Sequence, residues 1–292
     1  MSGRSTPAIT SRGGGRGERG IALLIVLWIL ALLALVAASF TLTSHTDITI
    51  ARNQVDSTDA RQLADSAVAR AVVGLSEPNP QQRWVADGRP YRWRFGDGEV
   101  VISIIDEGGK INLNGAPRDV LESAFRHAGA GDALSGDLAD SVMDRRQSPA
   151  TVTGNAAAFL ATEDLQTLPG MTAALYYRVA PLVTVYGQSP GVAAMFASRD
   201  VLLALPDGDL GEIDDFLAAR AAAASDPTTP PPAPPLSLAH YLSGGATGTV
   251  TIRARATTAT GAAFVRDATI ALQGTASQPF VAEAWKQLLT AE

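Results

Sequence analysis

A long apolar run dominates the hydropathy pattern near the N-terminus. Residues 21–40 read IALLIVLWILALLALVAASF, without a single charged residue. A helix rises about 1.5 Å per residue, so about twenty residues span the roughly 30 Å hydrocarbon core of a bilayer. The run therefore predicts a transmembrane helix over 21–40. The small residues Ala37, Ala38 and Ser39 also resemble a signal-peptidase site, which leaves a cleaved secretory signal as the alternative.

The helical pattern continues beyond this run. Between Ile21 and Leu75 the sequence has no proline, and Gly74 is its only glycine. Apolar residues recur close to the helical period, with charged residues between them. They are Ile48, Ala51, Val55, Leu63, Ala67, Ala71 and Val72. We expect a continuation over 41–77, ended by Pro78 and Pro80, in one helix about 80 Å long.

Period-two alternation predicts strands on both sides of a central segment. Aromatic residues alternate with arginines over 91–95, a Gly-Asp-Gly turn signal follows at 96–98, and an apolar run then reaches residue 105. This pattern indicates a β-hairpin. Three further alternating segments lie near the C-terminus, at 248–256, 262–272 and 280–285. We assign 78–105 and 236–292 to one antiparallel sheet.

The segment between these strands, 106–225, is rich in alanine and leucine and carries helix-start signals. The signals are Pro117-Arg118-Asp119, Glu163-Asp164, Thr172 and Ser198-Arg199-Asp200. The sequence at 116–121 recurs in altered form at 197–202, which predicts two similar helical units. Six prolines within 226–235 predict a stiff linker. The predicted fold class is α+β, with an all-helical domain inserted into an antiparallel sheet domain.

Charge divides the chain into a basic start and an acidic remainder. Residues 1–20 contain four arginines and one glutamate, a net of +3 that leaves −9 on the other 272 residues. Positive residues before an apolar helix keep that end in the cytoplasm, so we expect everything after residue 40 beyond the membrane. The acidic balance argues against a general nucleic-acid binder. The lack of cysteine excludes disulfides and thiolate zinc sites.

A processing signal precedes the apolar run. Arg19 and Gly20 stand directly before Ile21, and a short basic leader, a glycine and a hydrophobic helix form the layout of a type IV prepilin-like signal. Glycine suits the cleavage point because its backbone can lie extended in a protease site. We expect the leader 1–20 to be removed between Gly20 and Ile21. An ordinary membrane anchor with a basic flank is the alternative.

Six segments, spread over nearly the whole chain, carry a resemblance to a known family. They are RGIALLIVLWILALLALVA, RQLADSAVARA (61–71), DEGGKINLNGAPRDVLESAF (106–125), LPGMTAALYYRVAPLVTVYG (168–187), ASRDVLLALP (197–206) and FVAEAW. Together they resemble the minor pseudopilin K family of type II secretion systems, also called general secretion pathway protein K. Most processed pilins carry a glutamate at the fifth mature position, where this chain has Ile25. The resemblance associates that absence with a subunit that has no neighbour ahead of it.

The resemblance implies a pilin-like sheet domain with an inserted SAM-like or helix-hairpin-helix-like domain. It implies a single-pass protein of the inner membrane, cleaved by prepilin peptidase, methylated, and periplasmic for most of its length. The implied partners are minor pseudopilins I and J, the inner-membrane secretion platform and lipid, and not nucleic acid. The implied role is to initiate or cap the periplasmic pseudopilus, which exports folded proteins across the outer membrane. Two alternatives are a helix-hairpin-helix protein of DNA uptake and a generic single-span periplasmic protein.

Acidic residues are densest over 206–215. Asp207, Asp209 and Glu212 have a spacing that can place oxygen ligands around calcium, and similar subunits have been described as binding calcium. Calcium is therefore the one candidate cofactor. The alternative is a solvated loop whose acids cap the next helix.

Two further groups invite a chemical interpretation. Asp106, Glu107 and Lys110, followed by Asn112 and Asn114, predict a lattice of turns and caps rather than an acid–base pair. No Gly-x-Ser-x-Gly, Walker or His-Glu-x-x-His motif occurs, so we expect no enzyme.

The stretch LQTLPG, residues 165–170, resembles the hairpin of a helix-hairpin-helix module. DNA-binding hairpins meet phosphate through backbone N–H groups and a basic side chain. Here two acids accompany Arg178, which favours a helix-packing turn. Tyr176, Tyr177 and Tyr186 are expected either in the core or on a partner surface.

Overall fold

The computed structural model describes residues 18–148, 157–187, 189–225, 229–243, 245–272 and 279–288, without the side chains of 18–21 and 37–47. The chain divides into two compact units, residues 1–56 and residues 57–292. Most of the leader expected at 1–20 lies outside the described residues.

One helix, α1 (Glu18–Leu75), spans 58 residues belonging to both units. It confirms the predicted continuous helix and begins three residues before the expected start. The described side chains of the apolar run, 22–36, are all exposed; Leu24 is 62% and Trp28 70% exposed. Within the described residues no helix has a stretch long and apolar enough to cross a bilayer. The transmembrane helix predicted over 21–40 is thus not found there.

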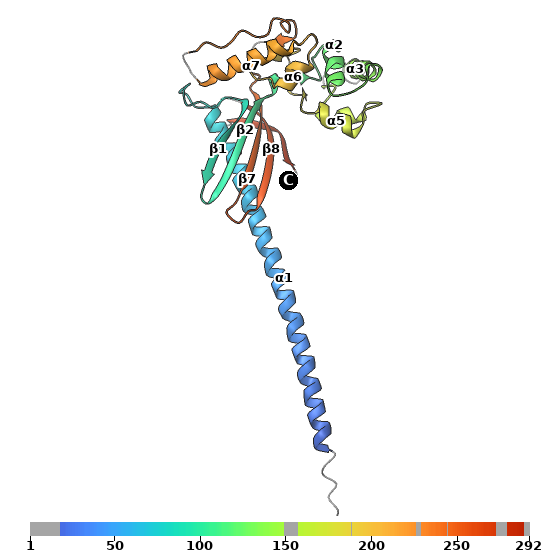
Figure 1. The fold of residues 1–292 in the computed structure, drawn as a ribbon, viewed down its shortest axis with the longest axis vertical. Coiled ribbons are helices and arrows are strands. Elements are labelled where there is room, and N and C mark those ends of the chain that lie inside the picture. The colour runs from blue at the N-terminus through green and yellow to red at the C-terminus, as the bar shows by residue number, and fades with distance from the viewer. Residues whose placement is uncertain are drawn as a thin grey trace, which may run out of the picture. The chain divides into compact units, whose positions relative to one another are not determined.

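The second unit contains a five-stranded antiparallel sheet with the order β1-β2-β7-β8-β9 (Figure 1). The strands are β1 (Asp87–Phe95), β2 (Gly98–Asp106), β7 (Thr249–Thr257), β8 (Ala263–Leu272) and β9 (Phe280–Leu288). Gly96, in the two-residue turn between β1 and β2, takes a φ of 57° that glycine adopts without strain. β2 pairs with β7, although residues 107–248 separate them. The predicted strands from both ends of the chain therefore form one sheet, as expected.

One face of the sheet packs against the part of α1 that belongs to the second unit. Ile102, Ile104 and Ile252 are fully buried and alternate with more exposed residues. The helix contributes a row of alanines without exposed area, Ala60, Ala64, Ala67 and Ala71. Their small side chains let the helix backbone approach the strands closely. We call this group of buried residues the sheet cluster.

The chain between β2 and β7 is mostly helical. Its helices are η1 (Glu107–Gly109), α2 (Arg118–His127), α3 (Asp132–Arg146), η2 (Thr162–Thr167), α5 (Ala173–Val179), α6 (Arg199–Ala204) and α7 (Leu210–Ser225). The predicted helix starts are confirmed to within one residue. Thr172 and Ser198 act as N-caps, because their hydroxyl groups accept the N–H of Leu175 and Val201.

The prediction that this segment is all-helical is wrong. It holds two pairs of short parallel strands, β3 (Ile111–Asn112) with β4 (Val183–Thr184), and β5 (Val192–Ala193) with β6 (Leu242–Ser243). Strands of two residues are too short to show an alternating pattern, so the sequence could not indicate them. β6 also lies beyond the predicted linker at 226–235, and the sheet resumes only at Thr249 instead of near residue 236.

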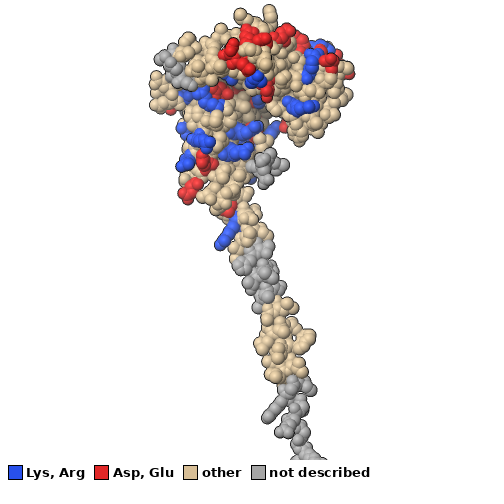
Figure 2. All heavy atoms as spheres, viewed as in Figure 1, with Lys and Arg blue, Asp and Glu red and all other residues tan. Residues whose placement is uncertain are grey.

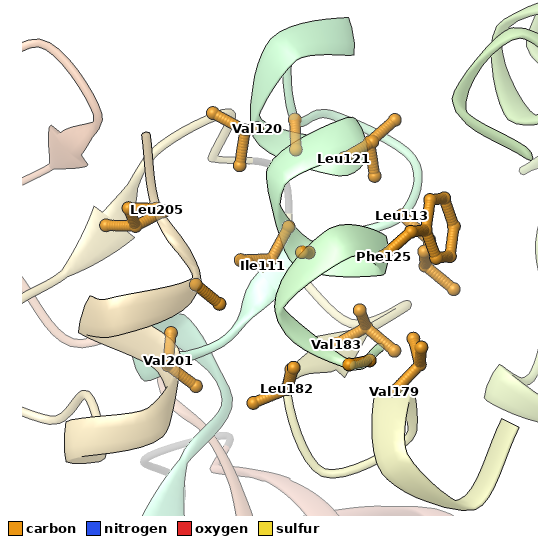
Figure 3. Close-up of a cluster of buried hydrophobic side chains, with 14 of the residues drawn as sticks. Ile111, Leu113, Val120, Leu121, Phe125, Val179, Leu182, Val183, Val201 and Leu205 are labelled. Carbon is orange, nitrogen blue, oxygen red and sulfur yellow. The ribbon is translucent and has the colours of Figure 1, made fainter. Parts of the chain in front are cut away.

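The same segment has a hydrophobic cluster of its own, which we call the helical cluster (Figure 3). Ile111 and Leu121 lie beside Val183 and Val201 in it, so β3, α2, β4 and α6 all contribute. Leu238, beyond the proline-rich linker, belongs to it too. The helical cluster shares no residue with the sheet cluster.

The sequence echo corresponds to a structural repeat, as predicted. In each copy a short strand precedes a helix that begins with arginine, and equivalent positions of β3 and β5, or of α2 and α6, differ by 81 in number. Each arginine binds an aspartate of the following helix. Nε of Arg118 lies 2.5 Å from Oδ1 of Asp140, and Nε of Arg199 lies 2.6 Å from Oδ1 of Asp214.

Candidate functional site

The expected processing point lies near the start of α1. Gly20 and Ile21 both lie in this helix. Ile25 is 54% exposed and stands within an uninterrupted apolar stretch. An apolar side chain thus occupies the position where most processed pilins carry glutamate. Cleavage between Gly20 and Ile21 stays a prediction.

The DEGGK stretch connects the sheet with the helical cluster. Asp106 and Glu107 are each only 2% exposed. Oδ1 of Asp106 accepts a hydrogen bond from the Thr247 hydroxyl at 2.8 Å. Oε1 of Glu107 accepts one from Thr251 of β7 and one from Lys110, both at 2.6 Å. These buried carboxylates are satisfied by structural donors, which confirms the predicted lattice of turns and caps.

Two asparagines extend this lattice into the helical segment. The Asn112 side chain donates to the Gly187 carbonyl at 2.9 Å and accepts the N–H of Asn114 at 2.8 Å. The Asn114 side chain in turn donates to and accepts from the Phe159 backbone, at 2.9 Å each. The asparagines therefore hold together segments that are distant in sequence.

The predicted calcium loop is used for helix capping. Oδ1 of Asp209 accepts the N–H of Glu212 at 2.8 Å, as an N-cap does. The Glu212 carboxylate accepts the N–H groups of Leu236 and Ser237 beyond the linker, and hydrogen bonds from Ser237 and Leu236 lower the pKa of Glu212. Asp207 is exposed, with a positive φ of 61°. Calcium requires six to eight oxygen ligands, and in this structure oxygens of Asp209 and Glu212 accept hydrogen bonds from backbone N–H groups.

In agreement with this, the described residues contain no group of three or more His, Asp or Glu side chains placed to hold a metal ion. Acidic side chains nevertheless gather over the helical segment on the face shown in Figure 2, while basic ones gather over the sheet. Residues 107–248 contain sixteen acidic and eight basic residues. Calcium binding stays a prediction.

The LQTLPG turn joins η2 to α5 and packs on α3. Gly170 takes a φ of 83°, and a Cβ there would come within 2.7 Å of Leu134. Arg178, the basic residue nearest the hairpin in sequence, lies close to Gly129. This geometry confirms the predicted helix-packing turn.

A cavity of about 430 Å³ lies between the helical segment and the sheet face opposite α1. Thr251 and Thr269 contribute to its sheet wall, and the three tyrosines of the sequence prediction contribute to its helical wall. Tyr176 is 8% exposed, whereas Tyr177 is 74% exposed. The core interpretation is therefore right for Tyr176 and wrong for Tyr177. Burial raises the pKa of Tyr186.

An ion pair that sequence reasoning missed borders this cavity. Nζ of Lys286 on β9 lies 2.6 Å from Oε1 of Glu163 in η2. Burial alone would raise the pKa of Glu163, but the hydrogen bond from Lys286 lowers it overall. Because 123 residues separate the partners, no local sequence signal could have indicated the pair.

Two partly buried arginines were also missed. Arg146 donates to the carbonyls of Leu113 at 2.8 Å and Ala116 at 2.7 Å. In the second copy of the repeat, Arg220 donates to the Ala197 carbonyl at 2.8 Å. Desolvation lowers the pKa of both guanidinium groups. The sequence signal was an arginine late in the second helix of each copy of the repeat. In both copies this arginine donates hydrogen bonds to backbone carbonyls that precede the first helix.

These features define a class of fold: an α+β protein in which part of a long N-terminal helix packs on an antiparallel sheet. Residues 19–69 match the family model described as PilX N-terminal. One chain of the crystal structure of the GspK-GspI-GspJ complex from the enterotoxigenic Escherichia coli type 2 secretion system has a similar fold. The TM-score is 0.55 at 16% identity, over 82% of this chain and 99% of that chain.

Two curated proteins narrow the class further. The chain is 30% identical over 205 residues to type II secretion system protein K of Klebsiella pneumoniae, covering 57% of this chain and 62% of that protein. It is 26% identical over 207 residues to the putative type II secretion system protein K of Escherichia coli K12, covering 58% of this chain and 62% of that protein. The matches thus span about three-fifths of these relatives. Over this span the chain is similar to type II secretion system protein K.

Proposed function

We propose that this chain is a minor pseudopilin of a type II secretion system, a structural subunit and not an enzyme. It stands at the tip of the periplasmic pseudopilus and initiates or caps its assembly for the export of folded proteins across the outer membrane. The 30% identity to the Klebsiella pneumoniae K protein carries the proposal. The similarity in fold to a chain of the GspK-GspI-GspJ complex supports the same architecture.

The proposed anchor is the helix over 21–40, in the inner membrane. The exposed, wholly apolar side chains of 22–36 suit contact with lipid. The leader, with its net charge of +3, keeps the N-terminus in the cytoplasm and leaves the chain after residue 40 in the periplasm. The anchor is processed by prepilin peptidase, so that the mature chain begins at a methylated Ile21.

Processing has a direct test. Gly20→Leu should block maturation in cells with active prepilin peptidase, because a branched side chain hinders the extended backbone at the cleavage point. Gly20→Ala is the matched control, and we expect it to retain partial cleavage. Mass spectrometry of the N-terminus gives the answer. A wild-type chain that still begins at Met1, or that begins at Thr41, would contradict the proposal.

The proposed neighbours are minor pseudopilins I and J and the inner-membrane secretion platform. Residues 107–248 form the proposed inserted domain, of a SAM-like or helix-hairpin-helix-like kind. Its own hydrophobic cluster supports this, as does the pairing of β2 with β7 on either side of it. A segment this large suits the end of a narrow fibre better than a repeated position within it.

Ile25 supports the terminal position. A glutamate within lipid needs a positive partner, and in most pilins the terminal amine of a neighbouring subunit supplies it. The first subunit of a fibre has no such neighbour, so an apolar residue avoids an unpaired buried charge. Ile25→Glu should reduce or leave unchanged the assembly measured by pseudopilus formation, while Ile25→Leu retains it. Improved assembly with Ile25→Glu would contradict a terminal position.

Co-purification tests the proposal as a whole. The full chain, expressed with pseudopilins I and J of the same system and extracted in detergent, should elute with both. If the chain bound neither pseudopilin but bound duplex DNA with steep salt dependence, the result would instead indicate the DNA-uptake alternative.

A further inference from the structure

The two edge strands of the sheet, β1 and β9, differ in how they are protected. An edge strand offers unpaired N–H and C=O groups to any other extended chain, unless proline, a bulge or charged side chains block it. On β1, Pro90 has no N–H, and the pairing register shifts between Asp87 and Pro90. The highly exposed Arg92 and Arg94 flank the same edge. All three protective devices therefore occur on β1.

Hydrogen bonds of the neighbouring strands identify the free groups of β9. The N–H of Leu272 donates to the carbonyl of Gly248. Backbone groups alternate in direction along an antiparallel strand, so those of even-numbered residues of β8 bond to β7 and those of odd-numbered residues bond to β9. Residue 267 pairs with 286 and residue 268 with 285. The N–H groups of Trp285 and Gln287 therefore point away from β8. β9 contains no proline, and both of these residues are exposed. The β8–β9 register also shifts once, between the partners Ala282 and Ala284, but this irregularity precedes Trp285 and Gln287.

The cavity described above borders this open edge. Lys286 and Leu288 of β9 line it together with Tyr177 and Ala180. Glu163 holds the Lys286 ammonium toward the helical segment, which leaves no lysine guarding the edge. In an added strand, the residues opposite Lys286 and Leu288 place their side chains on the cavity side of the sheet. Tyr177 and Leu288 give that side an apolar contact surface.

We infer that β9 is a strand-addition site, and that its occupant is an extended segment of a neighbouring pseudopilin with an apolar side chain facing this cavity. The inference rests on the proposed function. Backbone hydrogen bonds to Trp285 and Gln287 supply the attachment, while the cavity selects the side chain. β9 is the last strand in the sheet order and pairs with β8 alone, near the C-terminal end marked in Figure 1.

The test compares one substitution on the two edges. Gln287→Pro removes an outward N–H from β9 and should weaken binding to pseudopilins I and J at least tenfold. Arg94→Pro removes an outward N–H from β1. The N–H of Asp106 donates to the Ala86 carbonyl, so the even-numbered residues of β2 bond to β1, and the odd-numbered residues of β1 opposite them point inward. It should leave binding within twofold of wild type. Hydrogen exchange at Trp285 and Gln287 should slow in the wild-type complex relative to the free chain.

A second substitution covers the case in which proline disturbs β9 itself. Tyr177→Asp changes an exposed residue and should leave the melting temperature unchanged, but weaken binding severalfold by placing a charge at the cavity. Wild-type binding by both Gln287→Pro and Tyr177→Asp, or unchanged exchange at β9 in the complex, would overturn this inference alone. If the wild-type chain binds neither pseudopilin, the proposed function fails first.

Discussion

The sheet cluster and the helical cluster bury apolar surface in different ways. In the sheet cluster, alanines of α1 meet β-branched residues of the strands, and the contributing residues come from two ranges, 60–104 and 250–270. In the helical cluster, larger side chains such as Phe125 and Leu202 dominate, and all buried members lie within 111–238. One cluster needs both ends of the chain, while the other is complete within a single stretch.

This difference separates what each part requires in order to fold. No strand of the five-stranded sheet lies within the residue range of the helical cluster, so we expect its contacts to form without that sheet. The sheet cluster needs β2 and β7 to meet across 107–248, and the loop-closure entropy of so long a connection grows only logarithmically with its length. Two carboxylates, Asp106 and Glu107, then fix the junction. We expect two parts that fold separately and are joined by hydrogen bonds.

The largest expected effect comes from removing one part. A chain lacking 107–247, with Asp106 joined to Gly248 through a short glycine-rich turn, should keep its sheet, because Asp106 already pairs beside Val250. Limited proteolysis should leave a resistant fragment containing β1, β2, β7, β8 and β9. The isolated segment 107–247 should also resist. Complete digestion of both would show that neither cluster suffices alone.

The next largest expected effect comes from truncating one buried side chain in each cluster. Ile104→Ala and Leu121→Ala each remove a fully buried side chain and should cost about 2–5 kcal/mol of unfolding free energy. If the clusters unfold separately, calorimetry should show two transitions, with Ile104→Ala lowering one and Leu121→Ala the other. A single transition lowered equally by both substitutions would mean that the two clusters unfold as one.

Much of this division into two clusters could be predicted from the sequence, and the elements that could not be predicted share a physical reason. Helical and strand periodicities indicated α1 and the five strands, since each repeats over nine residues or more. The repeat was visible because segments 116–121 and 197–202 have nearly the same amino-acid sequence. The parallel strand pairs are too short for any period.

The site was predictable to a similar degree. Capping residues such as Thr172 and Ser198 act on their nearest neighbours, so local sequence was sufficient for them. The acids at Asp209 and Glu212 could be counted but not assigned, because capping and calcium binding use the same side chains. The Lys286–Glu163 pair depends on how distant segments pack, which no local pattern records.

The arginines that bind carbonyls test whether the two copies of the repeat contribute equally. Arg146→Met or Arg220→Met leaves partly buried carbonyls without a donor and should cost about 1–3 kcal/mol each. Arg146 binds beside the lattice of Asn112 and Asn114, so we expect its loss to cost more. Denaturant unfolding of both variants measures the difference. A larger loss for Arg220→Met would reverse the expected order of the copies.

A close approach between the two copies gives a comparable effect. A Cβ on Gly109 would lie 2.5 Å from the backbone of Phe196, which cannot move as a side-chain tip can. Gly109→Ala should therefore cost about 1–3 kcal/mol. Gly136→Ala is the matched control, because it lies within α3, where the nearest atom to its Cβ is 3.6 Å away, and alanine favours a helix. Equal melting temperatures for the two variants would exclude the close contact.

The smallest expected effect concerns the ion pairs that both copies share. Hydrogen bonding to Arg118 lowers the pKa of Asp140, and hydrogen bonding to Arg199 lowers the pKa of Asp214. A carboxyl group whose pKa is lower in the folded chain binds fewer protons there than when unfolded. Its stabilisation is complete above the unfolded pKa, near ~4, and is lost as the pH falls through the folded pKa.

Asp140→Asn and Asp214→Asn should therefore each lower the melting temperature slightly at pH 7, with the difference from wild type vanishing once the pH has fallen below the lowered pKa values. Because both pairs are about half exposed, 1 M salt should reduce the difference at pH 7. Asp137→Asn on the same helix is the control, since Asp137 forms no ion pair among the described residues. If the losses at Asp140 and Asp214 persisted unchanged in acid, the pairs would act through geometry and not through charge.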